Sequence, residues 1–326
     1  MNRIPRLAAA MLASLACLGA HAAESGAWPA QPINMIVPFP PGGVADAVGR
    51  PVAEALGRAL GQTVVVENRG GAGGGIGMGA VARAQPDGYT VLMALSSISI
   101  IPEADRILGR APMYQLDQLV PIARFTADPT VLVVPADSPW KTAQEFFQAA
   151  KDGPREIYYG SSGNYGTMHV PMEMLRNEAG LTKLTHVPFS GAGPAVVALL
   201  AGQVQAVSTG PASVLQHIKG GKLRALAHWG EGRLASLPDV PSLTELGHPV
   251  RFAQWSGLFV PAKTPEPVVM RLREAAGMAA KDERVRSVIE GAGSPIQYLD
   301  APAFAAYWAD DAKQITEAVR KIGKVE

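Results

Sequence analysis

The order of strand-like and helix-like segments is the feature that most restricts the fold of this chain. Short runs rich in Val, Ile, Leu and Tyr predict strands at residues 33–39, 63–68, 89–95, 130–135, 156–162, 184–189, 204–209, 223–229 and 255–261. Segments with apolar residues three to four positions apart predict helices between them, among them 44–60, 76–84, 141–151, 166–179 and 194–202. Such alternation predicts an α/β fold built on mainly parallel sheets. A chain of 326 residues is long enough for two such domains.

The N-terminus has the pattern of a secretory signal peptide. Arg3 and Arg6 precede an apolar run at 7–20, and the small residues of "AHAA" follow, which predicts export with cleavage after Ala22 or Ala23. The apolar run is too short for a comfortable membrane span, so we expect a soluble mature protein. The single cysteine, Cys17, leaves with residues 1–22, and the exported protein therefore has no disulfide. Ser14, three residues before Cys17, stands where a lipid-attachment motif has Leu, which argues against a lipid anchor.

Charge and motif content exclude several classes of function. A formal net charge of +1 without runs of like charge provides no field for nucleic acid. The six histidines have no metal-ligand spacing, and no cysteine remains to help them, so we expect no metal. The glycine-rich stretch 70–80 matches a dinucleotide fingerprint only in part, because extra glycines separate it from the preceding strand and no acid follows at the required distance. We therefore expect no cofactor.

The motif "YGSSGNYG" leaves an enzymatic alternative open. With Ser162 as nucleophile, Gly160 fits the pattern G-x-S-x-G, but Asn164 occupies the place of the second glycine. His169 is a nearby candidate base, and no third group that would orient it can be named. An exported hydrolase is thus the alternative, while the leading expectation is a protein that is not an enzyme.

Polar turns between a strand and a helix are the strongest signal for a binding site. The segment "PFPPGGVAD" leads through Gly42 and Gly43 into a helix with Asp46 in its first turn, and "YGSSGNYGT" leads into a helix that Thr167 could cap. Two more polar turns carry Ser96 with Ser97, and Gly191 ahead of Pro194 at a first helical position. Open α/β sheets bind ligands at such strand ends, and uncovered helix amides favour anions. No Lys or Arg lies in these turns. Asp46 has a second interpretation, in which it only satisfies the start of its own helix.

Six segments together resemble the substrate-binding proteins of tripartite tricarboxylate transporters, also called the Bug receptor family. They follow one another along nearly all of the mature chain: "WPAQPINMIVPFPPGGVADAVGR", "VVENRGGAGGGIGMGAVARAQPDGYTVLMA", "YGSSGNYGTMHV", "VPFSGAGPAVVALLAGQVQ", "GGKLRALAHWGEGRLASLPDVPSLTELG" and "WSGLFVPAKTPEPVVMRL". The resemblance implies a two-domain periplasmic binding protein of type II-like architecture, with the ligand in a cleft between the domains. It implies one domain from 24–126 plus 247–326 and another from 127–246. It also implies a monomer that delivers a small carboxylate to membrane permease subunits.

The resemblance, together with the polar turns, specifies the residues expected to bind the ligand. These are Phe39, Gly42, Gly43, Asp46, Ser96, Ser97, Ser162, Gly163, Asn164, Gly166, Thr167, His169 and Gly191. Two positions depart from the family pattern, because Gln205 stands where many relatives have an acid and Ser256 where relatives often have Tyr. An acid at position 205 could face a ligand ammonium. Its absence, with the lack of cations in the turns, predicts a mono- or dicarboxylate without a free amine.

Overall fold

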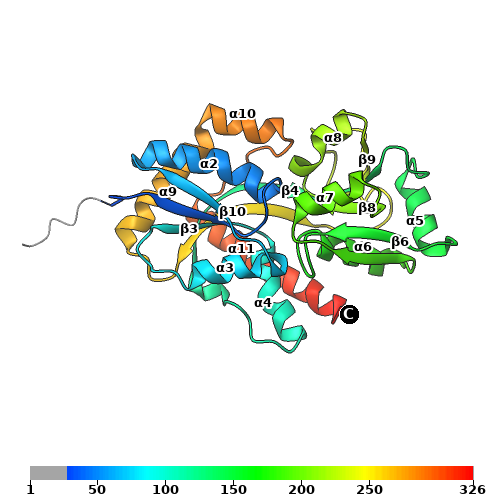
Figure 1. Ribbon diagram of the computed structural model, residues 1–326, viewed down its shortest axis with the longest axis horizontal. Coiled ribbons are helices and arrows are strands. Elements are labelled where there is room, and N and C mark those ends of the chain that lie inside the picture. Colours follow the sequence, from blue (N-terminus) through cyan, green and yellow to red (C-terminus); the bar gives the residue numbers. More distant parts are fainter. Residues whose placement is uncertain (1–27, 326) are drawn as a thin grey trace, which may run out of the picture.

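The computed structural model describes residues 28–325, which form two lobes side by side (Figure 1). The first lobe contains a five-stranded sheet in the order β2 (Val64–Asn68), β1 (Ile33–Val37), β3 (Thr90–Leu95), β10 (Ala253–Pro261) and β4 (Leu119–Pro129). The second contains a five-stranded sheet in the order β7 (Leu184–Pro188), β6 (Ile157–Ser161), β8 (Ala206–Thr209), β5 (Val131–Pro135) and β9 (Leu223–His228). The residues predicted to form the signal peptide lie outside the described part of the chain.

The two sheets have the same pattern of strand directions. Strands β1, β2 and β3 are parallel to one another, and β10 is antiparallel to both β3 and β4. In the second sheet β6, β7 and β8 are parallel, and β5 is antiparallel to both β8 and β9. Each sheet therefore has one strand that opposes the other four. The α/β fold with mainly parallel sheets is confirmed, and each of the nine predicted strands is present.

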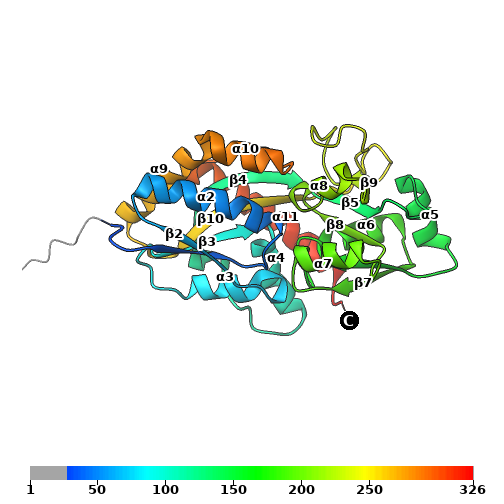
Figure 2. The same ribbon diagram turned by 45° about the horizontal axis from the view of Figure 1, so that its top comes forward.

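Helices cover both faces of each sheet (Figures 1 and 2). In the first lobe α2 (Val44–Leu60), α9 (Glu266–Lys281) and α10 (Glu283–Gly291) pack together on one face. The opposite face carries α3 (Gly75–Ala82), α4 (Ser97–Ile107) and α11 (Ala301–Ile322). In the second lobe α5 (Ala143–Asp152) and α6 (His169–Ala179) cover one face, and α7 (Ala192–Leu200) and α8 (Leu215–Lys219) the other. Three short 3-10 helices, η1 (Ala72–Gly74), η2 (Leu116–Gln118) and η3 (Pro211–Ser213), lie in the connections.

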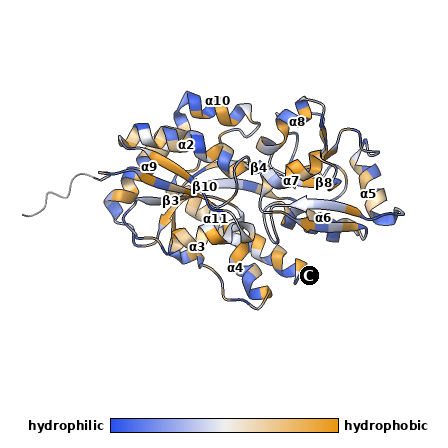
Figure 3. Cartoon of the chain, in the orientation of Figure 1, coloured by the Kyte–Doolittle hydropathy of each residue, from blue (hydrophilic) through white to orange (hydrophobic). Residues whose placement is uncertain are grey.

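Strand β5 shows why these runs are apolar throughout instead of alternating with polar residues. Its side chains point to opposite faces in turn, so that Val131 and Val133 join the core under α7, while Leu132 and Val134 join the core under α5 and α6. A sheet covered on both sides needs apolar residues on both. Figure 3 shows the same pattern at the level of the lobes, with hydrophobic strands inside and helices that are hydrophilic on their outer surface.

Strand β4 is absent from the sequence-based prediction. Its sequence "LVPIARFTADP" contains Pro121, Arg124 and Asp128, which interrupt an apolar pattern. The structure tolerates them because β4 is the edge strand of its sheet, where proline costs no ladder hydrogen bond on the open side. Residues 297–299 then cover this edge through backbone hydrogen bonds to Phe125 and Arg124.

Helix α4 is also missed, and the reason is local. The stretch "SISIIPEADRI" has three β-branched isoleucines near its start and Pro102 inside it, and both features lower helix propensity. Tertiary packing stabilises the helix despite this low propensity, because Ile98, Ile100 and Ile101 are all buried.

The chain passes between the two sheets at two places. Thr130 alone separates β4 from β5, and residues 229–252 connect β9 to β10. The C-terminal helix α11 belongs to the first lobe, and its end reaches the second, where the Tyr165 hydroxyl donates to the Gly323 carbonyl at 2.8 Å. Within residues 28–325, no helix combines the length and apolar content that a membrane span requires.

Candidate functional site

The carboxyl ends of the parallel strands in one lobe face those of the other lobe. The turn after β1 touches the start of α7 so closely that a Cβ atom on Gly191 would lie 2.5 Å from Pro40 Cδ. The loop before α3 touches the turn after β6, where a Cβ atom on Gly163 would lie 3.3 Å from the Gly73 nitrogen. The first contact is possible only because glycine has no side chain, and the second leaves little room for one. The structure therefore brings together the turns that precede α2, α6 and α7.

Several helix starts at this junction lack a side-chain cap. Among residues 28–325, none of the helices α2, α4, α6 and α7 is capped by the side chain of its N-cap residue. Away from the junction, Thr142, Asp282 and Asp300 cap α5, α10 and α11, whereas α9 has no such cap. Uncapped helix starts present backbone N–H groups and a partial positive charge. The junction is thus suited to an anion.

The first polar turn uses one of its amides internally. The Asp46 carboxylate accepts hydrogen bonds from the Gly42 N–H at 3.1 Å, from Asn68 at 3.0 Å and from Arg50 at 3.1 Å. Burial alone would raise the pKa of Asp46, but these hydrogen bonds outweigh it and hold the pKa below its usual value. Asp46 thus satisfies the turn ahead of its own helix, as in the second interpretation above. Phe39 and Gly43 are buried beside it, and the Phe39 carbonyl accepts from Asn68.

The second polar turn, residues 162–167, differs from the prediction at Thr167. Helix α6 starts after Met168 without a side-chain cap, so the predicted capping role of Thr167 is wrong. The Thr167 hydroxyl instead accepts a hydrogen bond from Gln254 of β10 at 2.5 Å. Tyr165 holds a positive φ of +57° at the centre of the turn, and its N–H donates to His169 Nδ1 at 3.0 Å. The predicted position of Pro194 is also shifted, because α7 begins two residues earlier, at Ala192.

Buried hydroxyl groups without partners mark the junction most clearly. Ser96, Ser97 and Ser162 are each at most 4% exposed, and among residues 28–325 their hydroxyls have no hydrogen-bond partner. Thr209, at the end of β8, is also buried, and its hydroxyl also lacks a partner within residues 28–325. The sequence-based prediction did not include it. A signal for it exists, because "STG" places a hydroxyl residue and a glycine after a strand, as in the other turns. Unpaired buried polar groups are costly, so each of these hydroxyls is available to a ligand or water.

A cavity of about 250 Å³ opens between the lobes. Ser162, Gly163 and Asn164 line it from the second lobe, and residues 71–73 and Ile101 line it from the first. The other predicted residues do not line it. Arg110 also reaches this cavity, so a cation does approach the junction, but its guanidinium lies 2.8 Å from the Asp105 carboxylate.

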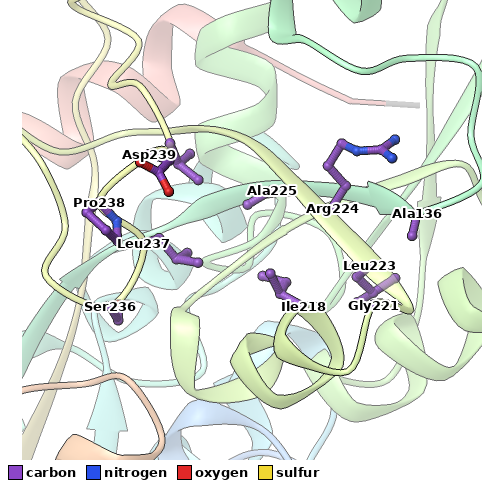
Figure 4. A pocket seen from close by; sticks show the side chains of 11 residues that line it. Ala136, Ile218, Gly221, Leu223, Arg224, Ala225, Ser236, Leu237, Pro238 and Asp239 are labelled. Atoms are coloured by element: carbon purple, nitrogen blue, oxygen red, sulfur yellow. The ribbon is translucent and has the colours of Figure 1, made fainter.

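A larger hollow of about 540 Å³ lies elsewhere, in the second lobe (Figure 4). It is bounded by Ile218 of α8, by Leu223 and Arg224 of β9 and by residues 236–240. None of the predicted site residues lines it. We place the candidate site at the junction, because four unpaired buried hydroxyls and the uncapped starts of α2, α4, α6 and α7 lie there.

The predicted Ser162–His169 pair is not formed. His169 Nε2 and the Ser162 hydroxyl both lack partners among the described residues, while the Ser161 hydroxyl lies 2.5 Å from His186 Nε2. The two imidazole rings pack 4.1 Å apart, and no carboxylate is hydrogen-bonded to either within residues 28–325. Burial lowers the pKa of His169 to about 3 and that of His186 to about 3, so both rings are neutral. The cluster lacks the third group that a triad requires.

The histidine cluster predicts sensitivity of the fold to acid. Because the pKa values of His169 and His186 are depressed in the folded state, only the unfolded chain takes up these protons as the pH falls from 6.5 towards 3. Stability is therefore lost over this range. Replacing His186 with Gln, which cannot be protonated, is expected to reduce the loss between pH 7.5 and pH 5 by about 1–2 kcal/mol. Urea unfolding of both proteins at the two pH values measures this, and an equal loss in both would contradict it.

Gln205 does not reach the candidate site. It precedes β8, and its side-chain oxygen accepts from the Tyr158 N–H at 2.9 Å, near the amino ends of β8 and β6. The candidate site lies at the opposite, carboxyl ends. The absence of an acid at position 205 is therefore no evidence about an amine on the ligand. Ser256 already has a hydrogen-bond partner, since its hydroxyl lies 2.7 Å from the Thr126 hydroxyl.

Two α/β lobes joined by crossing strands, with uncapped helices meeting at the junction, define a periplasmic binding protein fold. Comparison with known proteins gives the family. Residues 48–324 match the model of the tripartite tricarboxylate transporter family receptor, and the chain belongs to this family. Receptors of this family are periplasmic and bind substrates.

Individual relatives cover almost the whole chain. A UPF0065 protein from the gbd 5' region of Cupriavidus necator is 33% identical over 97% of this chain and 96% of its own. The structure of the periplasmic binding protein BugD is 31% identical with a TM-score of 0.85, covering 90% of this chain and 98% of BugD. MatC from Rhodopseudomonas palustris with bound malate is 28% identical with a TM-score of 0.83, covering 90% of this chain and all of MatC.

Proposed function

We propose that this receptor captures a small mono- or dicarboxylate at the junction of its two lobes and delivers it to the membrane permease subunits of a tripartite transporter. The observation that carries the proposal is a set of buried hydroxyls at strand ends of both lobes that have no hydrogen-bond partner among residues 28–325: Ser96, Ser97, Ser162 and Thr209. They stand beside helix starts that no side chain caps. Hydroxyl and amide donors of this kind suit a carboxylate.

The size and charge of the junction support a small ligand with few charges. A cavity of about 250 Å³ falls below the range of about 300–1,000 Å³ that accommodates drug-sized molecules. Arg110, which lines it, is already paired with Asp105, so every further carboxylate on a ligand would need its own donors. The bound malate of MatC, a relative at 28% identity, is consistent with this class. Citrate, with three carboxylates, is therefore a poor match.

Titration calorimetry with a matched set of acids tests the proposal. We expect saturable binding in the micromolar range to at least one of malate, succinate, adipate and benzoate, and at least about tenfold weaker binding of citrate. The physical reason is that several charge-assisted hydrogen bonds of about 1.5–3 kcal/mol each suffice for one or two carboxylates. Aspartate, added to the set, decides whether an amine is accepted. Tight binding of citrate with no binding of the other acids would refute the ligand class.

The same preparation separates a receptor from an enzyme. The alternative is an exported hydrolase with Ser162 as nucleophile, which would turn over esters and lose activity in Ser162→Ala. We propose that the protein has no such activity, because neither Ser162 nor His169 has a catalytic partner within residues 28–325. Incubation with p-nitrophenyl esters measures it, and turnover that disappears in Ser162→Ala would overturn this proposal.

Export and domain limits complete the proposal. We propose that the chain is exported, cleaved after Ala22 or Ala23 and functions as a periplasmic monomer. One domain comprises residues 24–126 plus 247–326 and the other 127–246, which is supported by the division of the strands between two sheets. The short link at Thr130 and the segment 229–252 would then form the hinge.

A further inference from the structure

Gln254 is a buried residue of β10 whose side chain leaves its own sheet to contact the other lobe. It is 1% exposed, and its amide makes two hydrogen bonds. The oxygen accepts from the Gly210 N–H at 3.0 Å, and the nitrogen donates to the Thr167 hydroxyl at 2.5 Å. Gly210 follows β8 and Thr167 precedes α6, so one amide of the first lobe joins two strand-end turns of the second.

The chemistry of the partners determines which way round the amide lies. A backbone N–H can only donate, so the side-chain oxygen must face Gly210 and the NH₂ group must face Thr167. Gly210 is packed closely against this amide, since a Cβ atom there would lie 2.6 Å from Gln254 Oε1 and 2.7 Å from Val44 Cγ2. The amide is therefore held in one orientation.

A hydroxyl that accepts from an NH₂ group must direct its own proton elsewhere. Thr167 is 1% exposed, and among residues 28–325 its hydroxyl has no hydrogen bond other than the one from Gln254. Its proton is thus free to be donated. The preceding turn contains Ser162, whose hydroxyl also lacks a partner. Both hydroxyls belong to the turn 162–167, of which Ser162 lines the cavity between the lobes and Thr167 lies behind it.

We infer that Gln254 is a positioning residue for ligand capture: it orients the Thr167 hydroxyl as a donor to the bound carboxylate and couples that turn to β10, the first-lobe strand that follows the crossing segment 229–252. The inference rests on the proposed function for the ligand itself. Gln254 does not touch the ligand. It acts through Thr167, and it fixes the Gly210 turn beside Thr209 at the same time.

A double-mutant cycle tests whether Gln254 acts through Thr167. Gln254→Met has similar length without the polar atoms, and Thr167→Val has similar shape without the hydroxyl. Calorimetric titration with whichever of malate, succinate, adipate and benzoate the wild type binds is expected to show about tenfold weaker binding in each single variant and about tenfold, not a hundredfold, in the double variant. A residue with a merely structural role would instead give independent losses that multiply. Multiplied losses, or unchanged affinity in Gln254→Met, would overturn the inference.

A control and a ligand-free measurement complete the experiment. Gln205→Met removes a comparable side-chain to backbone hydrogen bond outside the site and is expected to leave affinity unchanged. Hydrogen exchange of the Gly210 amide in the ligand-free protein is expected to be faster in Gln254→Met than in the wild type. Unchanged exchange of the Gly210 amide would refute the statement that Gln254 holds the Gly210 turn. If the wild type binds none of malate, succinate, adipate and benzoate, the proposed function fails, and the exchange measurement still decides whether Gln254 holds the turn.

Discussion

Replacing Gly193 with Val is expected to abolish tight ligand binding while leaving the fold intact. Gly193 lies in the first turn of α7 with ordinary helical φ, and a Cβ atom there would lie 2.7 Å from the Pro41 carbonyl oxygen of the other lobe. That atom is backbone and cannot rotate away. A side chain at this position therefore separates the lobes, although it does not strain the helix that carries it.

The expected loss of affinity in Gly193→Val follows from the hydrogen-bond donors that the ligand loses when the lobes are held apart. If a carboxylate loses two charge-assisted hydrogen bonds of about 1.5–3 kcal/mol each, its affinity falls by at least about a hundredfold. Stability should change by less than about 1 kcal/mol, because glycine is itself a poor helix residue. Titration calorimetry and urea unfolding measure the two quantities.

Gly291→Val is the matched control for this prediction. Gly291 is the last residue of α10, and nothing lies within 4 Å of the place where its Cβ atom would be. This variant is expected to bind as the wild type does. Gly163 is a less suitable position, because its φ of +113° means that any side chain there strains the folded chain as well. Wild-type affinity in Gly193→Val would show that the contact between Pro41 and α7 is not required for capture.

Replacing Asp128 with Asn is expected to stabilise the protein strongly at alkaline pH. Asp128 lies near the end of β4, is 3% exposed, and its Oδ2 has no partner among residues 28–325. Burial raises the pKa of Asp128 to about 7, and Ser294 and Arg124 offset this only in part. A carboxylate in this environment is ionised at pH 8 at a considerable cost in stability.

The sign of the pH dependence follows from the raised pKa. Well below pH 4 the carboxyl is protonated in both the folded and the unfolded state, and the cost is absent. As the pH rises from about 4 to about 7 the unfolded chain releases this proton while the folded state retains it, so stability falls over this range and then stays level. About three pKa units correspond to about 4 kcal/mol. Asp128→Asn should therefore gain about 3 kcal/mol at pH 8 and almost nothing at pH 4, as measured by urea unfolding. The exposed Asp137, changed to Asn, should show no gain at either pH. Equal stability of wild type and Asp128→Asn at pH 8 would contradict the burial argument.

The local sequence was sufficient for those parts of the fold that depend on neighbouring residues. Apolar strand runs such as 130–135 and the helix at 44–60 were predicted at almost their observed limits. For the strands the reason is that a sheet covered on both faces needs a continuous apolar run. Strand β4 and helix α4 could not be predicted in this way. Their prolines and polar residues are accommodated by an edge position and by burial, and both are properties of the assembled sheet.

The candidate site divides in the same manner. Glycine and serine after a strand identified the turns at 42–43, 96–97 and 162–167, since these residue types are what a strand-to-helix turn with uncovered amides requires. Which polar groups are already satisfied was beyond the sequence, because it depends on residues distant along the chain. The Asp46 carboxylate is hydrogen-bonded to Asn68, Arg50 and the Gly42 amide. The Thr167 hydroxyl accepts a hydrogen bond from Gln254. Thr209 lies at the end of β8, which brings it to the site. Sequence alone thus determined the fold class and the chemical character of the turns, whereas the tertiary structure decided which donors remain free, because hydrogen bonds form between groups that only folding brings together.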